Sequence, residues 1–401
     1  MVNPSRIQLT GALAEHRQGL WDALSASGYS PLSALNLLRL AAHLSRWLDA
    51  HGIPLKELTH ERMAVFLESR RRSHTHFFTP RALAPILHYL EAVDALTVAA
   101  PVLAAPTASD RLIAGYRDYL LHERGLSAGS IRAYGDIGLS FLHASVTDRS
   151  DITLLKAADV TSFVVEAGPR YSTGMCKYIV TALRSLLRYL YLQGELALDL
   201  SGALPAVAGW HLQGLPKAFD AGQVRCLLCA CDRRRHAGRR DHAVLLLLVR
   251  LGLRAAEVAA LELDDIDWRA GEFQVCGKGG REERLPLPAD VGKALATYLL
   301  KSRPATRARY VFLGVRAPHD PLRASAISAI ARAALKRAGL PASNPHRLRH
   351  TAATGMLHAG ASLDEVAQVL RHRSHDTTAI YAKVDRQALR HVMQPWPGES
   401  S

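Results

Sequence analysis

A repeated pattern of apolar residues is the feature of this sequence that most restricts its fold. The first stretch lies between residues 58 and 90, and its apolar positions recur 97 to 100 residues later. Both stretches place these residues at helical intervals. The matched residues are Leu58, Met63 and Phe66 with Leu155, Val160 and Phe163, and Leu83, Ile86, Leu87, Tyr89 and Leu90 with Leu183, Leu186, Leu187, Tyr189 and Leu190. The repeat predicts two small all-α domains of similar plan, unless it only reflects the likeness of any two amphipathic helix pairs.

Two stretches without a helical pattern divide the 401 residues into three parts. Residues 97–109 are rich in Ala, Val and Pro, and residues 204–219 contain prolines and glycines. We therefore predict an N-terminal helical domain at 1–105, possibly a duplicate of the next, a second helical domain at 108–205 and a third domain at 216–401. The third part reads as helices with one hairpin, whose strands are expected at 272–276 and 284–287. The predicted fold class is mainly α with a small β-sheet or hairpin.

The charge balance points to a polyanionic partner. Lys and Arg total 50 against 36 Asp and Glu, which gives a net charge of +14, and Arg greatly outnumbers Lys. Because the guanidinium is a planar fork suited to phosphate, nucleic acid is the expected partner. A genome whose codons favour Arg would produce the same excess. Within the second part, Arg132, Lys177, Arg184 and Arg188 form a candidate DNA-facing surface, although a merely solvated face would look the same.

The cysteines and the apolar runs bear on the compartment. Five Cys is an odd number, which argues against a disulfide framework and fits a reducing cytoplasm. Cys226, Cys229 and Cys231 resemble half of a zinc site, but no second pair follows at zinc spacing, so we expect them to be core residues. No apolar run is long enough for a membrane span, and the N-terminus has no signal-peptide pattern.

Several residues that could bind an anion or take part in catalysis lie in the third part. Arg254 follows Gly252 and begins a short helix, where a helix N-terminus already favours anions. Asn344 and Pro345 predict a helix start, so that His346, Arg349 and His350 share one helix face. The two histidines could instead be a metal pair, but no third ligand completes it at a known spacing. Further residues are Lys278 at the hairpin tip, His372 just beyond a helix that a capping box at 362–365 begins, and Tyr381. Arg281, also at the hairpin tip, is a candidate DNA-binding residue.

Together these residues resemble the catalytic domain of the tyrosine recombinase (phage integrase) family. The segments 252–261, 277–287, 346–351, 369–372 and 377–381 match the family's motifs in order and spacing. The catalytic set carried over by the resemblance is Arg254, Lys278, His346, Arg349, His372 and Tyr381. The likeness is strong over residues 216–390 and weaker over residues 108–200, which resemble the family's SAM-like core-binding domain, whereas residues 1–105 match no standard element. The sequence departs from the family at Arg371, where relatives commonly have Gly, and this places an extra cation beside the site.

The resemblance implies a mechanism without metal, ATP or any other cofactor. Tyr381 would attack the scissile phosphate and form a 3′-phosphotyrosyl link, while Arg254 and Arg349 hold the developing charge. Lys278 would protonate the leaving 5′-oxygen, His346 would exchange the tyrosine proton, and His372 would hydrogen-bond the phosphate. Glu257 and His350 are expected to support these residues.

The implied function is site-specific recombination of double-stranded DNA at particular sites by a tetramer of this chain. Integration, excision, transposition and dimer resolution remain open, as do a mobile-element origin and cooperation with related recombinases. The expected location is the bacterial cytoplasm, at the nucleoid, with no membrane partner. A nicking and closing enzyme of the type IB topoisomerase kind is one alternative, and a DNA-binding accessory protein without catalysis is another. A C-terminal helix within residues 385–396 is expected to dock either on a neighbouring protomer or on its own domain.

Overall fold

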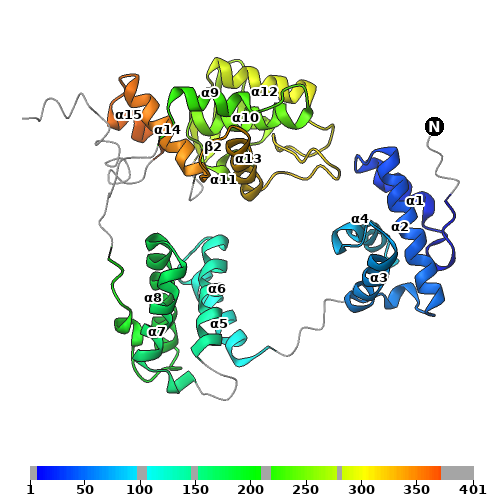
Figure 1. Cartoon of the computed structure of the whole chain (residues 1–401), viewed down its shortest axis with the longest axis horizontal. Helices are drawn as coiled ribbons and strands as arrows, with labels where there is room; N and C mark the ends of the chain where they lie inside the picture. The colour runs from blue at the N-terminus through cyan, green and yellow to red at the C-terminus, as the bar shows by residue number, and fades with distance from the viewer. Residues whose placement is uncertain (1–6, 97–105, 146–151, 209–217, 278–281, 372–401) are drawn as a thin grey trace, which may run out of the picture. The chain divides into compact units, whose positions relative to one another are not determined.

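The computed structural model describes residues 7–96, 106–145, 152–208, 218–277 and 282–371 (Figure 1). The described parts are mainly helical, with one three-stranded antiparallel sheet, which confirms the predicted fold class. The chain divides into two compact units, residues 99–213 and residues 1–98 together with 214–401. Both divisions fall at or close to the stretches expected to be linkers. The separation of residues 1–105 from the third part stays a prediction.

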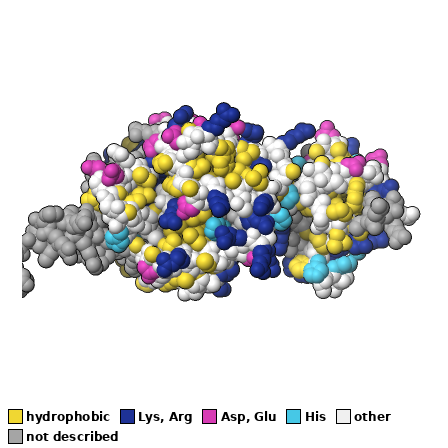
Figure 2. All heavy atoms as spheres, turned by 90° about the horizontal axis from the view of Figure 1, so that it is seen from above, with side chains coloured by type: hydrophobic (Ala, Val, Ile, Leu, Met, Phe, Trp, Pro, Cys, Tyr) yellow, Lys and Arg dark blue, Asp and Glu magenta, His cyan; other side chains and the backbone are white. Residues whose placement is uncertain are grey.

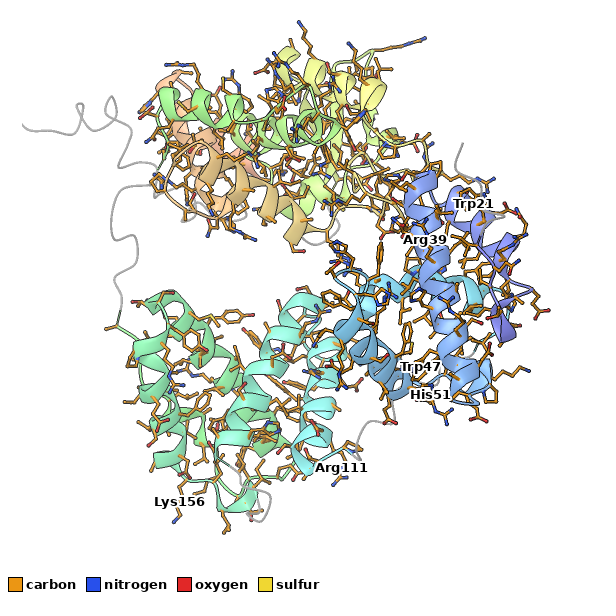
Figure 3. The ribbon with its side chains drawn as sticks, turned by 45° about the vertical axis from the view of Figure 1, so that its right-hand side comes forward. Trp21, Arg39, Trp47, His51, Arg111 and Lys156 are labelled. Atoms are coloured by element: carbon orange, nitrogen blue, oxygen red, sulfur yellow. The ribbon has the colours of Figure 1, made fainter. Side chains whose placement is uncertain are left out.

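The N-terminal stretch is a small helical bundle with its own apolar core. Its core unites buried residues from Leu9 to Leu96. Ser30 caps one helix, with Pro31 at the first position, and Thr59 caps the next. At one end of the second helix, Trp47 and His51 lie side by side, with ring centroids 4.5 Å apart (Figure 3). The elements are η2 (Gly11–Leu13), α1 (Arg17–Ala26), α2 (Pro31–Ala50), η3 (Leu55–Glu57), α3 (His60–Ser73) and α4 (Pro80–Ala92).

The second unit also has four α-helices within its described residues, around a second core, and a short 3-10 helix again lies between the second and the third of them. A capping box of Thr107 and Asp110 begins its first helix. Its core unites buried residues from Ile113 to Leu204. The elements are α5 (Ala108–His122), α6 (Ala128–Ser145), η4 (Ile152–Leu154), α7 (Ala157–Ala167), η5 (Gly168–Arg170), α8 (Thr173–Leu192) and η6 (Leu200–Ala203).

A matching glycine and tyrosine pair supports the idea that these two bundles share one plan. A Cβ atom on Gly19 would lie 2.1 Å from the Tyr89 hydroxyl, and one on Gly115 would lie 2.6 Å from the Tyr189 hydroxyl. In each bundle, therefore, the first helix lacks a side chain where the tyrosine of the fourth helix crosses it. The short helices η3 and η4 are likewise 97 residues apart, which is the offset of the apolar repeat.

The third part of the chain surrounds a buried helix, α10 (His236–Arg250), with other helices and a small sheet. Residues 243–249 of α10 are all buried, so this helix is the centre of the core. The strands β1 (Ile266–Asp267), β2 (Glu272–Cys276) and β3 (Glu282–Pro286) pair in that order. The remaining elements are α9 (Ala221–Cys229), α11 (Ala255–Ala260), η7 (Leu263–Asp265), α12 (Ala289–Lys301), α13 (Ala324–Arg337), α14 (Pro345–His358) and α15 (Leu363–Leu370).

Two details differ from the sequence predictions. Cys226 and Cys229 are exposed, so the prediction that all three clustered cysteines are core residues was wrong. The reason is that α9 is amphipathic and buries Leu227, while Cys231 beyond its end is buried. The second strand of the hairpin begins at Glu282 rather than at residue 284, and β1 adds a third strand to the expected hairpin. Within the described ranges, no helix is both long and apolar enough to cross a membrane.

Candidate active site

The site begins at a sharp turn between α10 and α11. Gly252 has a φ of +60°, and a Cβ atom there would lie 2.5 Å from the Leu370 side chain. Only glycine meets both requirements without strain, because it accepts the left-handed conformation and has no side chain. The turn brings Arg254 to the N-cap position of α11, at the start of a short helix as the sequence predicted.

Glu257 holds Arg254 in place. The Glu257 carboxylate accepts a hydrogen bond from the Arg254 backbone N–H at 2.7 Å and another from its Nη1 atom, also at 2.7 Å. The Glu257 side chain is 4% exposed, whereas that of Arg254 is 35% exposed. The carboxylate therefore anchors the guanidinium from beneath and leaves part of it open to solvent.

Arg349 joins three segments of the chain. It lies on α14, which begins at Pro345 after Asn344 as predicted, although the Asn344 side chain forms no capping hydrogen bond. Its side chain is buried, donates from Nη1 to the Gly252 carbonyl at 2.6 Å, and also hydrogen-bonds the Leu370 carbonyl. The end of α10, the face of α14 and the end of α15 thus meet at one guanidinium.

His346 and His350, on the first turns of α14, both favour the neutral form. The pKa of His346 is lowered, mainly because the surrounding protein desolvates part of a ring that is otherwise exposed, and further because Arg349 and Arg254 lie nearby. The pKa of His350 is lowered by burial first, and then by His346 and Arg349. A neutral imidazole can accept a proton near neutral pH, which is the property required of a general base.

Arg371, the extra cation expected beside the site, is the cap residue of α15 and has a φ of +55°. Its guanidinium does not extend into solvent but is buried against Glu257, with Nη2 2.5 Å from Oε2. The capping box of Ser362 and Glu365 begins this helix as predicted.

The remaining predicted site residues fall into two groups. Lys278, Arg281, His372, Tyr381 and the tail at 385–396 lie outside the described residues. Arg132 on α6 and Lys177, Arg184 and Arg188 on α8 are described, and all four are exposed. More widely, Lys and Arg side chains are spread over the described surface, with several of them close together on the face shown in Figure 2.

Two contacts that the sequence analysis missed fasten α14 to the start of the third part. The Phe219 backbone N–H donates to the Thr351 hydroxyl at 3.0 Å. The Arg347 guanidinium lies over the Phe219 ring, 3.9 Å from its centroid. In the sequence, the only sign of these contacts is that Arg347 and Thr351 are four residues apart, which puts their side chains on one face of the helix.

Comparisons with known proteins match the second and third predicted domains to families. Residues 217–388 match the Phage integrase family, and residues 113–194 match the Phage integrase, N-terminal SAM-like domain. The putative integrase/recombinase y4rA of Sinorhizobium fredii is 42% identical over 378 residues, which cover 93% of this chain and 92% of the relative. The tyrosine recombinase XerD of Listeria monocytogenes is 32% identical over 292 residues, which cover 70% of this chain and 96% of XerD.

A solved structure shares the fold. The XerH site-specific recombinase, bound to a palindromic difH substrate in a post-cleavage complex, has a TM-score of 0.56 at 19% identity. The match covers 84% of this chain and 98% of XerH. Together with the matches in sequence, this likeness shows that the chain belongs to the phage integrase family of tyrosine recombinases, the enzymes that break and rejoin DNA in site-specific recombination.

Proposed function

We propose that this chain cleaves DNA with Tyr381, through a 3′-phosphotyrosyl intermediate, and rejoins the strands at specific sites. The observation that carries the proposal is the position of Arg349, which hydrogen-bonds the carbonyls of Gly252 and Leu370. Gly252 stands two residues before Arg254, and Leu370 stands two residues before His372. Three separate motifs of the family are therefore connected through one buried side chain.

The arginines supply the charge that phosphate cleavage requires. In the first step, the Tyr381 oxygen forms a bond to phosphorus and the bond to the 5′-oxygen breaks. The transition state gathers negative charge on the non-bridging oxygens, which Arg254 and Arg349 would stabilise. Both guanidiniums are oriented by fixed acceptors, so little reorganisation is needed when the DNA binds.

The protons are assigned to neighbouring side chains. The tyrosine hydroxyl would transfer its proton to His346, whose neutral form is favoured by its surroundings. Lys278 would give a proton to the leaving 5′-oxygen, and His372 would hydrogen-bond the phosphate. A 5′-hydroxyl from a partner strand then attacks the phosphotyrosine and releases the tyrosine. The covalent link conserves the energy of the broken bond, so the proposal requires neither ATP nor a metal ion.

DNA binding would use the second unit as well as the catalytic region. Lys177, Arg184 and Arg188 lie on one side of α8 at intervals of seven and four residues, and all three are exposed. Such a row suits successive phosphates of a duplex. We assign residues 108–205 to core binding, residues 216–401 to catalysis, and residues 1–105 to a third domain. The protein would act at the bacterial nucleoid, where four protomers would join two DNA sites.

The likeness to y4rA favours a recombinase with an additional N-terminal part. The match covers 93% of this chain, so it extends into residues 1–96, whereas the match to XerD covers nearly all of XerD with 70% of this chain. We therefore place the chain among integrases of mobile elements, which integrate, excise or transpose DNA, in preference to chromosome dimer resolution.

A two-site plasmid assay tests the proposed function. Plasmids would carry pairs of segments from the DNA that flanks the gene for this chain, and would be incubated with the full-length protein. We expect recombination that depends on the inserted segments and disappears in Tyr381→Phe. Relaxation of any supercoiled plasmid without recombination would support a topoisomerase instead, and unchanged recombination in Tyr381→Phe would contradict the proposal.

A further inference from the structure

Arg371 occupies a backbone position that normally suits glycine. Its φ of +55° and ψ of +52° lie in the left-handed region, where a side chain is disfavoured. Its backbone N–H caps the end of α15 by donating to the carbonyls of Ala367 and Gln368. Glycine would make the same cap with less strain, so capping alone does not explain an arginine here.

The side chain of Arg371 is directed into the protein. It is only 4% exposed, and its Nη2 atom lies 2.5 Å from Glu257 Oε2. Its Nη1 atom donates to the Val369 carbonyl at 3.3 Å, a favourable contact for a cation at a helix C-terminus. A buried guanidinium is costly unless it is paired, so the contact with Glu257 determines the position of this side chain.

Glu257 connects Arg371 to Arg254. The oxygen that meets Arg371 also accepts from the Arg254 backbone N–H at 2.7 Å, and the other oxygen accepts from Arg254 Nη1 at 2.7 Å. One carboxylate thus pairs with two guanidiniums, that of Arg254 three residues before it and that of Arg371 114 residues after it. The three groups carry one net positive charge, which an incoming phosphate would balance.

We propose that Arg371 is a positioning residue that, through Glu257, orients the Arg254 guanidinium toward the scissile phosphate. This inference rests on the proposed function, because it requires that Arg254 meets the phosphate. By sharing the negative charge of Glu257, Arg371 leaves more of the positive charge of Arg254 available to the DNA. It also holds the carboxylate at a fixed place, so that Arg254 cannot rotate away together with its partner.

Arg371→Gly removes the guanidinium but keeps the backbone cap, so it tests the side chain alone. Nicked suicide duplexes from the DNA flanking the gene would report the rate of covalent adduct formation in a single turnover, and a binding assay would report the Kd. We expect a rate at saturating DNA that is lower by about tenfold or more, while the Kd changes by less than about twofold. Arg371→Lys, which keeps the charge but not the fork, should recover part of the rate.

A matched control addresses the effect of glycine itself. Asp94 also has a left-handed backbone, with a φ of +56°, and its side chain is exposed. Asp94→Gly should raise the thermal midpoint and leave adduct formation unchanged. Arg371→Gly should keep the fold for the same backbone reason, and yet lose rate.

A double variant tests whether Arg371 acts through Glu257. Glu257→Gln should slow cleavage, and Arg371→Gly added to it should cost much less than it does alone. If the rate losses of the two single variants multiply in the double variant, Arg371 acts independently of Glu257. A wild-type rate in Arg371→Gly would mean that Arg371 is only a helix cap. Either result overturns the inference. If Arg254→Ala and Tyr381→Phe also cleave normally, the proposed function has failed instead. Should Arg371→Gly fail to fold, Arg371→Lys combined with Glu257→Gln provides the same comparison.

Discussion

Arginine side chains occupy two contrasting environments in this chain. In the catalytic region, Arg349 and Arg371 are buried, and each hydrogen-bonds acceptors from distant segments. In the second helical unit, Arg184 and Arg188 are exposed on α8. Burial forces a guanidinium into one orientation before DNA arrives, whereas an exposed arginine keeps its side-chain freedom until it meets a phosphate. The first environment suits the chemical step, and the second suits adjustable contact with the DNA backbone.

The largest effect should follow from changing Arg349. Arg349→Ala removes the proposed transition-state cation and leaves the Gly252 and Leu370 carbonyls without its donors, so we expect cleavage to fall by about 10³-fold. The free energy of unfolding should also fall, by about 1–3 kcal/mol. Single-turnover adduct formation and chemical denaturation measure the two effects. Rapid cleavage by this variant would contradict the idea that the buried arginines serve the chemical step and the exposed ones serve DNA contact.

Arg254→Ala should slow cleavage by about 10²-fold, with a smaller loss of stability than in Arg349→Ala. The reason is that Arg254 is partly exposed, while Glu257 keeps Arg371 as its partner. The measurement is the cleavage rate at saturating DNA, together with the Kd. Weaker DNA binding with an unchanged rate at saturating DNA would mean that Arg254 only binds DNA, which is the role proposed for the arginines of α8.

The pH dependence of cleavage should reflect the lowered pKa of His346. Since the ordinary value is about 6.5, we expect the rate at subsaturating DNA to hold down to that pH and to fall only below it. His346 has a lower pKa in the folded chain than in the unfolded one, so the unfolded state binds more protons at this residue as the pH falls through about 6.5. Its contribution to stability should therefore decrease as the pH falls. An acid limb above pH 7, or one that persists in His346→Gln, would contradict this assignment.

The smallest effects should come from α8. Arg184→Ala and Arg188→Ala should each weaken DNA binding several-fold and reduce the slope of log Kd against log salt by about 0.9. Cleavage at saturating DNA should remain unchanged, since these residues are proposed to contact the DNA backbone and not to take part in the chemistry. Arg111→Ala, which removes an exposed arginine from α5 instead of from α8, is the matched control. A defect in cleavage at saturation would show that α8 contributes to the chemical step.

Local signals in the sequence predicted much of the catalytic region. Pro345 after Asn344 marks the start of α14, and the Ser362 and Glu365 pair marks the start of α15, because capping depends on neighbouring residues alone. The two residues of β1 are too few to show an alternating pattern. Cys226 and Cys229 were misplaced because the apolar character of α9 did not indicate which of its faces is buried.

The connections within the site could not be predicted in the same way. Arg349 and Leu370 are 21 residues apart, and Arg371 and Glu257 are 114 residues apart. No periodicity links residues at such separations, so only the folded chain shows that they meet. The sequence did indicate that Arg371 was unusual, but its solvent-free contact with Glu257 required the structure.

The proposed function depends above all on a covalent bond between Tyr381 and DNA. The most direct measurement is mass spectrometry of the peptide that remains attached to DNA after full-length protein has reacted with nicked suicide duplexes tiling the DNA that flanks the gene. We expect a 3′-phosphoryl nucleotide on Tyr381, and no adduct from Tyr381→Phe. An adduct on another residue, or none from the folded protein on any of the duplexes, would contradict it.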